Sequence, residues 1–244
     1  MNKHIKDAWE TVVCPRDSPD GPLPRLLVLL TVVTGLVDAF SYLELGRVFV
    51  ANMTGNVVFL AFAAGGAPGF LWWASLLAIF TFMAGAFIGG RIAHSRRTHR
   101  GRHLLLAVAI QAVLVLAAFI VAAALVAPYN DLALVVLIML LGVGMGIQNA
   151  TARSLAVPDM TTTVLTLTIT GISADSSAAG GSSSKLGRRL IAVASMFVGA
   201  LVGALLAEAG HGPWALLIAS LVLAVVTIGA FRTIHSTDGW VTKR

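Results

Sequence analysis

Six long apolar stretches constrain this chain more than any other feature of its sequence. Each comes close to the roughly 20 residues that cross the hydrocarbon core of a bilayer as an α-helix. Because 57% of the residues are hydrophobic and only 11% are charged, one soluble domain could not bury so much apolar surface. The sequence therefore predicts an all-α polytopic membrane protein. The stretches are residues 23–43, 70–93, 104–127, 132–152, 190–208 and 214–231.

The positive charges indicate which connections lie in the cytoplasm. Fifteen of the 17 Lys and Arg residues fall in the N-terminal tail, the 91–102 loop, the 185–189 loop and the C-terminal tail. Short loops rich in Lys and Arg stay on the cytoplasmic side of a membrane. We therefore expect a multi-pass protein with both termini in the cytoplasm. The same rule explains the net charge of +6 without nucleic acid, so the lipid bilayer is the expected partner and nucleic acid is not.

A polar motif occurs twice along the chain. Val50–Leu60 reads VANMTGNVVFL and Val157–Leu167 reads VPDMTTTVLTL, with five of eleven positions identical. The small-residue patterns Gly85–Gly89 and Gly199–Gly203 follow the two motifs at a similar distance. Repeated halves that carry a polar break at matching places are the usual sequence pointer to the central site of a transporter.

The motif segments 48–66 and 161–178 are expected to dip into the membrane and return to the side from which they came. If both crossed fully, the chain would have eight spans and its arginine-rich 91–102 loop would lie outside, against the charge rule. Re-entry leaves three spans per half, an odd number, so the two repeats are inverted. Because 48–66 is just long enough to span, eight full spans stay the alternative. The expected domains are a cytoplasmic tail at 1–22, membrane repeats at 23–127 and 128–232, and a cytoplasmic tail at 233–244.

The polar residues of the motifs and of the neighbouring spans are candidate substrate-binding residues. Asn52 or Thr54 is expected to cap a helix that starts near the membrane midplane, and Asp159 to cap its counterpart. Two helix N-termini would then meet with their partial positive charges, which suits an anion or a strongly polar neutral solute. The simpler alternative is that these residues only cap helices. The full candidate set is Asp38, Asn52, Thr54, Asn56, Gln148, Asn149, Asp159, Thr161 and Thr162.

Asp38 is expected inside the first span, on the same helix face as Thr34 and Ser41. A carboxylate among apolar side chains is costly unless it is paired or protonated. It is therefore either a coupling acid that carries protons or one member of a buried hydrogen-bonded pair, and the sequence leaves both open. Gln148 and Asn149 take the equivalent place in the second half, where the carboxylate has become an amide.

Several kinds of chemistry find no support in the sequence. Cys14 is the only cysteine, which excludes an intramolecular disulfide and thiolate metal clusters. His94, His99 and His103 are loosely spaced in a loop rich in arginine, so we expect no metal there. No set of nucleophile, base and orienting residue can be recognised. We expect neither an enzyme nor a cofactor.

Four short blocks also resemble a known group of proteins. They are Gly35–Ala39, Val48–Asn56, Gly146–Ala150 and Val157–Thr163, and they are similar to the YoaK-type family of bacterial membrane proteins. The resemblance extends over roughly residues 25–232. It implies a bacterial inner-membrane protein of a family whose activity is not established, and it supplies no substrate or site residues.

Three functional classes follow from these observations. The leading hypothesis is a transporter or permease for a small polar or anionic solute, with a site near the bilayer midplane between two repeats. The first alternative is a non-transporting sensor or assembly partner, whose basic loop at 91–103 docks a cytoplasmic protein. A membrane-embedded enzyme that uses Asp38, Asp159 and Thr161 is the least favoured. A homo-oligomer is compatible with all three.

Overall fold

The structure is a computed structural model that describes residues 8–9, 11–13, 18–96, 98–125, 127–160, 162, 165–181 and 185–242. Within these residues it contains helices and no strands. Six helices are long and apolar enough to cross a membrane, which confirms the predicted class. They are α2 (Leu23–Glu44), α4 (Trp72–Ser95), α5 (Arg100–Ala124), α6 (Asp131–Leu155), α8 (Leu186–Glu208) and α9 (Pro213–Phe231).

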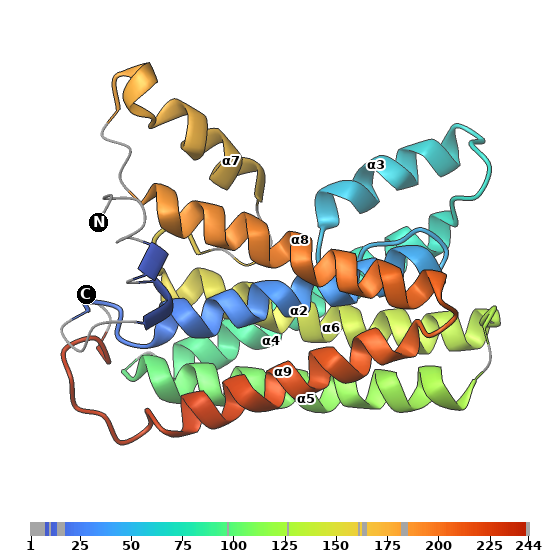
Figure 1. Cartoon of the computed structure of the whole chain (residues 1–244). Coiled ribbons are helices and arrows are strands. Elements are labelled where there is room, and N and C mark those ends of the chain that lie inside the picture. The colour runs from blue at the N-terminus through green and yellow to red at the C-terminus, as the bar shows by residue number, and fades with distance from the viewer. Residues whose placement is uncertain are drawn as a thin grey trace.

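Two shorter apolar helices, α3 (Met53–Ala64) and α7 (Leu165–Ala174), lie in the two predicted motif segments. A one-turn 3-10 helix, η1 (Ser177–Ala179), follows α7. The two short helices stand out from the same side of the bundle and point away from each other (Figure 1). Each packs on one long helix of its own half, α3 on α4 and α7 on α8.

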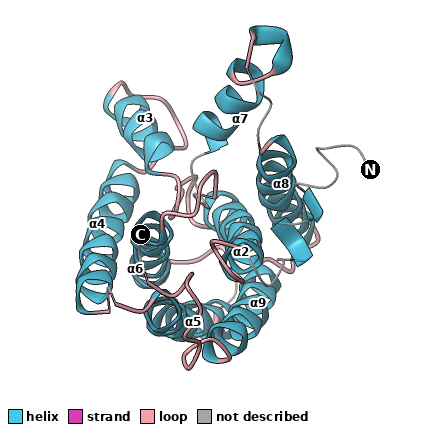
Figure 2. Ribbon diagram, turned by 90° about the vertical axis from the view of Figure 1, so that its left-hand side faces the viewer, coloured by secondary structure: helices cyan, strands magenta, loops and turns pink. Residues whose placement is uncertain are grey.

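Four long helices, α2, α5, α6 and α9, surround the central core, and α4 and α8 pack on the outside of α6 and α2 (Figure 2). The most extensive contacts join α2 to α8 and α4 to α6, followed by α5 with α9 and α5 with α6. Glycine allows the closest of these approaches. A Cβ atom on Gly35 would overlap the carbonyl of Met196 in α8, and one on Gly146 would overlap the carbonyl of Phe82 in α4. Small residues at such crossings are typical of helix packing in membranes.

The bundle has two chemically different ends. At the first, which we call the basic end, the Arg100 guanidinium donates to the carbonyl oxygens of Leu155 and Trp240 and pairs with Asp20. The start of α2, the end of α9 and the described residues 233–242 lie at this end (Figure 1). At the other, which we call the opposite end, Glu44 lies beside Gly212. The basic loop is shorter than the predicted 91–102, because α4 runs to Ser95 and α5 already begins at Arg100.

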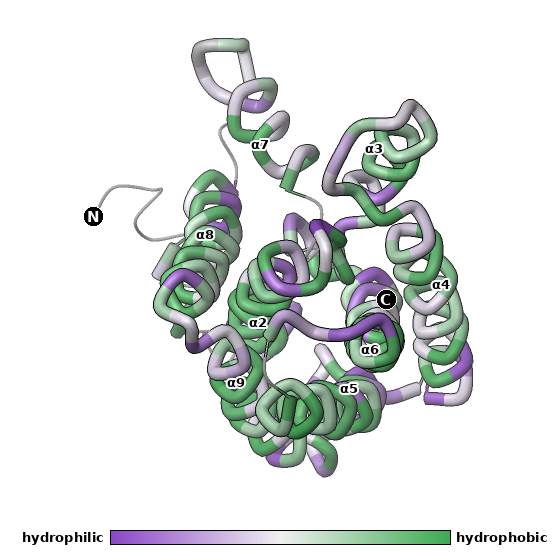
Figure 3. Tube along the Cα trace, turned by 90° about the vertical axis from the view of Figure 1, so that its right-hand side faces the viewer, coloured by the Kyte–Doolittle hydropathy of each residue, from purple (hydrophilic) through white to green (hydrophobic). Residues whose placement is uncertain are grey.

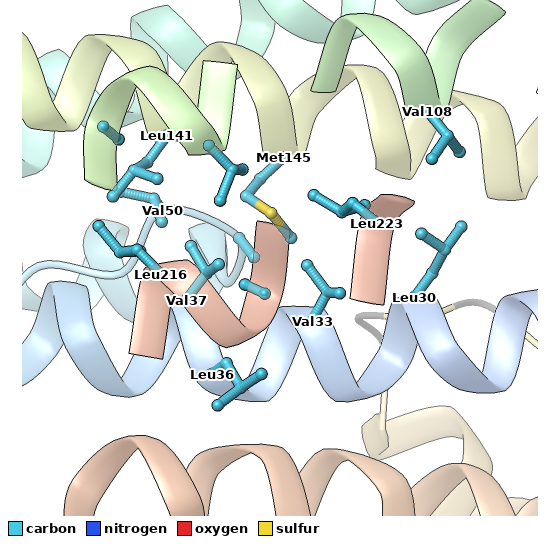
Figure 4. Close-up of a cluster of buried hydrophobic side chains, with 14 of the residues drawn as sticks. Leu30, Val33, Leu36, Val37, Val50, Val108, Leu141, Met145, Leu216 and Leu223 are labelled. Carbon is cyan, nitrogen blue, oxygen red and sulfur yellow. The ribbon is translucent and has the colours of Figure 1, made fainter. Parts of the chain in front are cut away.

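The bundle is apolar both inside and outside. Leu30, Val33 and Leu141 are completely buried and meet side chains from α5 and α9 in the core (Figure 4). Hydrophobic residues also cover the outward-facing turns of the long helices (Figure 3). Phe87 and Val113, for example, are 69% and 67% exposed. An outer surface of this kind suits lipid and not water, because apolar patches of such size are rare on soluble proteins.

Candidate functional site

Asp38 holds the first polar segment against the bundle. Its side chain is 3% exposed, and its Oδ1 atom accepts hydrogen bonds from the backbone N–H groups of Val50 at 3.1 Å and Ala51 at 2.9 Å. The Oδ2 atom is also buried and has no hydrogen-bond partner among the described residues. The carboxylate, in the second half of α2, thus holds the chain just before α3 begins. Its partners are backbone amides, which no side-chain pattern could have indicated.

Asn56 fixes the turn that leads into α3. Its side chain is completely buried, accepts from the N–H of Phe49 at 2.9 Å and donates to the carbonyl of Phe49 at 2.6 Å. These two bonds occupy both ends of the amide. Asn56 therefore serves the backbone, and it does not line the pocket described below.

Asn52 is the N-cap residue of α3, but its side chain makes no capping hydrogen bond. The prediction that Asn52 caps this helix is therefore wrong, although the helix starts where the motif predicted. The side chain of Asn52 instead lines a pocket, and only its backbone carbonyl takes part in the helix start, where it accepts from Gly55. Thr54, the second residue of the helix, is exposed and lines the same pocket.

A pocket of about 300 Å³ lies where the two short helices begin. Its walls come from the first turns of α3 and α7 and from the two long helices α4 and α6. The pocket therefore brings together the two copies of the polar motif. A volume of this size fits a small metabolite. The lining residues are Ala51, Asn52, Met53, Thr54, Phe82, Asn149, Leu165 and Thr166.

Asp159 does not take the place in the second half that Asn52 takes in the first. Its backbone is left-handed, with φ 60°, and its carboxylate pairs with Arg189 at 3.0 Å and with Lys185 at 3.8 Å. Met160 and Thr162 after it are not helical, and α7 is described from Leu165 onward. The prediction that Asp159 caps this helix is therefore wrong. An ionised carboxylate is more stable beside cationic groups near the start of α8 than alone deeper in the membrane.

The remaining threonines of the second motif are less informative. Thr161 lies outside the described residues. Thr162 is 4% exposed and left-handed, with φ 41°, and its hydroxyl has no hydrogen-bond partner among the described residues. It does not line the pocket.

Gln148 and Asn149 are neighbours on α6 that face different surroundings. Gln148 donates to the hydroxyl of Thr34 at 2.8 Å and to the carbonyl of Leu30, and it accepts from Gln111 at 2.6 Å. This buried network joins α2, α5 and α6. Asn149 instead lines the pocket. Sequence reasoning missed Gln111, although a lone amide within an apolar span was a usable signal.

The pocket thus unites three predicted residues, Asn52, Thr54 and Asn149, and adds Phe82 and Thr166, which were not predicted. Asp38 contacts it indirectly, through the backbone of a lining residue. No Asp, Glu, Lys or Arg lines it. Among the described residues, no group of three or more His, Cys, Asp or Glu side chains could hold a metal ion. The pocket offers the side-chain amides of Asn52 and Asn149, the hydroxyls of Thr54 and Thr166 and the aromatic ring of Phe82.

Comparison with known proteins adds the class of the molecule. The sequence model of a family described as "Protein of unknown function (DUF1275)" matches residues 26–229. The chain is 36% identical over 152 residues to the UPF0700 transmembrane protein YoaK of Bacillus subtilis (strain 168). This match covers 62% of the chain and 65% of the relative, slightly less than two thirds of its length. No solved structure matches.

Proposed function

Because this chain belongs to the family described as "Protein of unknown function (DUF1275)", an integral membrane family whose description names no activity, we propose its function from the geometry of the site. The protein is a transporter for a small polar solute, which binds near the bilayer midplane between two inverted repeats. One observation carries the proposal: the pocket is formed by both copies of the polar motif, at the starts of two half-length helices.

The packing of the helices supports two repeats. The first half is α2 to α5 and the second is α6 to α9. Contacts of the first half have counterparts in the second: α2 with α8 corresponds to α6 with α4, and α5 with α6 corresponds to α9 with α2. With three long helices per half, the second repeat enters from the other side. The opposite directions of α3 and α7 agree with this inversion (Figure 1).

The lengths of the short helices favour re-entry over eight full spans. The 12 residues of α3 extend over roughly 18 Å at about 1.5 Å per residue, and the 10 residues of α7 over less. The hydrocarbon core is about 30 Å thick. Each short helix is therefore long enough to run from the midplane to one surface, but too short to cross the whole core. The positive-inside rule supports a cytoplasmic location for the basic end.

The lining favours a neutral polar solute or a small anion. Side-chain amides of Asn52 and Asn149 and the hydroxyls of Thr54 and Thr166 can donate and accept hydrogen bonds. The first turns of two helices add partial positive charge. Since Asp159 is engaged with Arg189, no carboxylate repels an anion there. A cation would find no ionised partner in the lining.

Asp38 is the candidate coupling residue. It lies next to the pocket and bonds the segment that leads into α3. Its unpartnered Oδ2 atom is a place for a proton in the middle of the bundle. Alternating access in inverted-repeat transporters consists largely of one unit moving against the other around a fixed site. A proton on Asp38 would change the charge that holds the polar segment to α2.

Flux measurements test the proposal. The purified protein in liposomes should take up at least one member of a panel of small polar metabolites and anions. Asn52→Ala and Asn149→Ala should abolish that uptake. Thr227→Val is the matched control, because Thr227 bonds only to the carbonyl of Leu223 in its own helix and lies outside the pocket. Uptake that survives both pocket changes would remove the site assignment.

The basic loop offers less support for the alternative of a docking sensor. Arg100 is engaged by Asp20, Leu155 and Trp240, and Arg102 donates to the carbonyl of Ile234. These contacts give two of the loop arginines a structural role within the chain. Absence of enzymatic activity is likewise part of the proposal, since the pocket contains hydrogen-bonding groups but no nucleophile with an adjacent base.

A further inference from the structure

A second, larger cavity lies at the basic end, away from the solute pocket. It is a groove of about 760 Å³ between α2 and α9, the first and last long helices. The transport proposal makes no use of it. Its lining residues are Val12, Arg25, Leu26, Val28, Leu29, Val225, Ile228, Gly229, Arg232 and Thr233.

The walls of this groove are apolar and open to the outside of the bundle. Val225 and Ile228 are 58% and 55% exposed, whereas Leu26 on the floor is 5% exposed. Gly229 contributes no side chain, and a Cβ atom there would come within 2.9 Å of Leu26. The helices α2 and α9 therefore approach each other closely at this position, and Leu26 and Gly229 form the floor of the groove. In a membrane-spanning bundle, the natural filling of such a groove is hydrocarbon.

Two arginines lie at one end of the groove. Arg25 is in the first turn of α2, and Arg232 directly follows the last residue of α9. Both are exposed, and within the described residues neither forms an ion pair. Among the described residues, no carboxylate lines the groove. Guanidinium groups bind phosphate oxygens in a bidentate way, so this pair suits a phosphodiester.

The described residues of the N-terminal segment also indicate contact with a membrane surface. Trp9, Val12 and Val13 are 62%, 51% and 47% exposed, and Val12 lines the groove. Residues 9, 12 and 13 share one face of a helix. Trp and apolar residues on one face are typical of segments that lie in the headgroup region of a membrane. The groove therefore opens at the level where phospholipid headgroups lie.

From these observations we infer that the groove binds one anionic glycerophospholipid. Its phosphate contacts Arg25 and Arg232, and an acyl chain lies along Leu29, Val225 and Ile228. The apolar wall and the unpaired charges fit a lipid with a negative headgroup and do not fit a soluble anion alone. Negatively charged lipids in the cytoplasmic leaflet are attracted to such basic groups. The inference is independent of the transport proposal.

Native mass spectrometry of the detergent-purified protein tests this inference. We expect dioleoyl phosphatidylglycerol to bind about 10- to 30-fold more tightly than dioleoyl phosphatidylcholine, on the scale of two basic residues near a lipid surface. Arg25→Ala/Arg232→Ala should reduce this preference to near unity. Arg91→Ala/Arg153→Ala is the matched control, because it removes the same charge from exposed residues outside the groove. That control should keep the preference.

Two further measurements identify the source of the bound phosphate and guard against misfolding. Glycerol phosphate without acyl chains should not displace the lipid, and displacement would assign the arginines to a soluble anion. Arg25→Lys/Arg232→Lys retains the charge and should keep most of the preference even if the alanine variant fails to fold. Equal binding of the two lipids by the wild type, or equal loss in the control and groove variants, would overturn the inference.

Discussion

At the scale of single residues, Asp38 has the clearest double role. The sequence predicted a buried acid with either a hidden partner or a proton. The structure supplies backbone partners for Oδ1 and none, among the described residues, for Oδ2. The amide donors lie 12 and 13 residues further along the chain. Their meeting depends on how residues 45–51 turn back toward α2, which side-chain periodicity does not encode.

Replacement of Asp38 by asparagine separates these roles. Asn keeps the Oδ1 acceptor for the Val50 and Ala51 amides but cannot release a proton at neutral pH. If Asp38 carries protons, Asp38→Asn should bind solute normally and transport it without dependence on a pH gradient. Asp38→Ala should lower the free energy of unfolding by about 2–5 kcal/mol, because two buried amides lose their acceptor. Flux with and without a gradient, alongside thermal unfolding, measures both effects.

Either result decides whether Asp38 carries protons. A pH dependence that is unchanged in Asp38→Asn would leave the carboxylate with a structural role only. The solute pocket would still stand, since its lining does not include Asp38.

Asn52 and Asn56 form a second contrast, because they look alike in the motif and differ in the structure. Asn52 makes no capping bond and lines the pocket. The side-chain oxygen and nitrogen of Asn56 both form hydrogen bonds with the backbone of Phe49. We expect Asn56→Ala to lower the free energy of unfolding by about 2–3 kcal/mol, since it leaves buried backbone groups unpaired. Asn52→Ala should leave stability within about 0.5 kcal/mol and abolish solute binding. Thermal unfolding and solute binding, measured on the same samples, check both expectations. A loss of stability in Asn52→Ala, or of solute binding without loss of stability in Asn56→Ala, would contradict them.

At the scale of elements, the two motif copies show how far a repeat can guide prediction. Both short helices occur in the predicted segments, because each motif follows a long apolar stretch and precedes another. Asp159 does not precede the second helix directly, since Met160 and Thr162 are not helical, and its carboxylate pairs with Arg189 and Lys185 instead. Sequence equivalence of Asn52 and Asp159 hid this difference. An ionised group responds to nearby charge, and an amide does not.

Arg189 is the centre of the contacts that hold α7 to α8. Its guanidinium pairs with Asp159 and with Asp175 at 2.7 Å, and it donates to the carbonyl of Gly171. Arg189→Gln should destabilise this connection by about 1–3 kcal/mol, because two carboxylates lose their partner. In a Cys14→Ser background, the labelling rate of Thr168→Cys by a thiol reagent should rise, because Thr168 is the buried residue of α7, 6% exposed.

Lys185→Gln is the control for this prediction. Lys185 lies 3.8 Å from Asp159 and its side chain is 44% exposed, so its pair contributes little. Labelling should stay close to the wild-type rate in Lys185→Gln. Equal acceleration in both variants would mean that the general loss of positive charge, and not the Arg189 contacts, loosens α7.

At the scale of the whole molecule, hydropathy alone predicted the six long helices. Apolar length is a local property, and the need to satisfy every backbone group in lipid leaves little choice but helix. The order in which the helices pack could not be predicted from the sequence. Contacts between α2 and α8 or α4 and α6 depend on glycines such as Gly35 and Gly146, whose partners lie far away in the chain. The pocket depends on that packing, because Phe82 and Asn149 reach it from different halves.

The orientation in the membrane is the prediction on which the transport mechanism depends most. If α3 re-enters, Ala67 faces the outside and the α4–α5 loop faces the cytoplasm. If α3 crosses fully, the two positions exchange sides. Ala67 and Thr98 are both exposed and suit cysteine labelling, whereas a Cβ atom on Gly101 would overlap Thr233. In a Cys14→Ser background, an impermeant thiol reagent on intact cells should label Ala67→Cys and spare Thr98→Cys until the membrane is opened.

The reverse labelling pattern would contradict more than the topology. Four full crossings per half would make the two repeats parallel, because an even number of crossings returns the chain to its starting side. The starts of α3 and α7 would then not approach the midplane from opposite sides. The partial positive charges of the two helices would no longer converge on one solute. With the predicted pattern, Asn52 and Thr166 belong to two oppositely oriented units that share one pocket, which is the arrangement that alternating access requires.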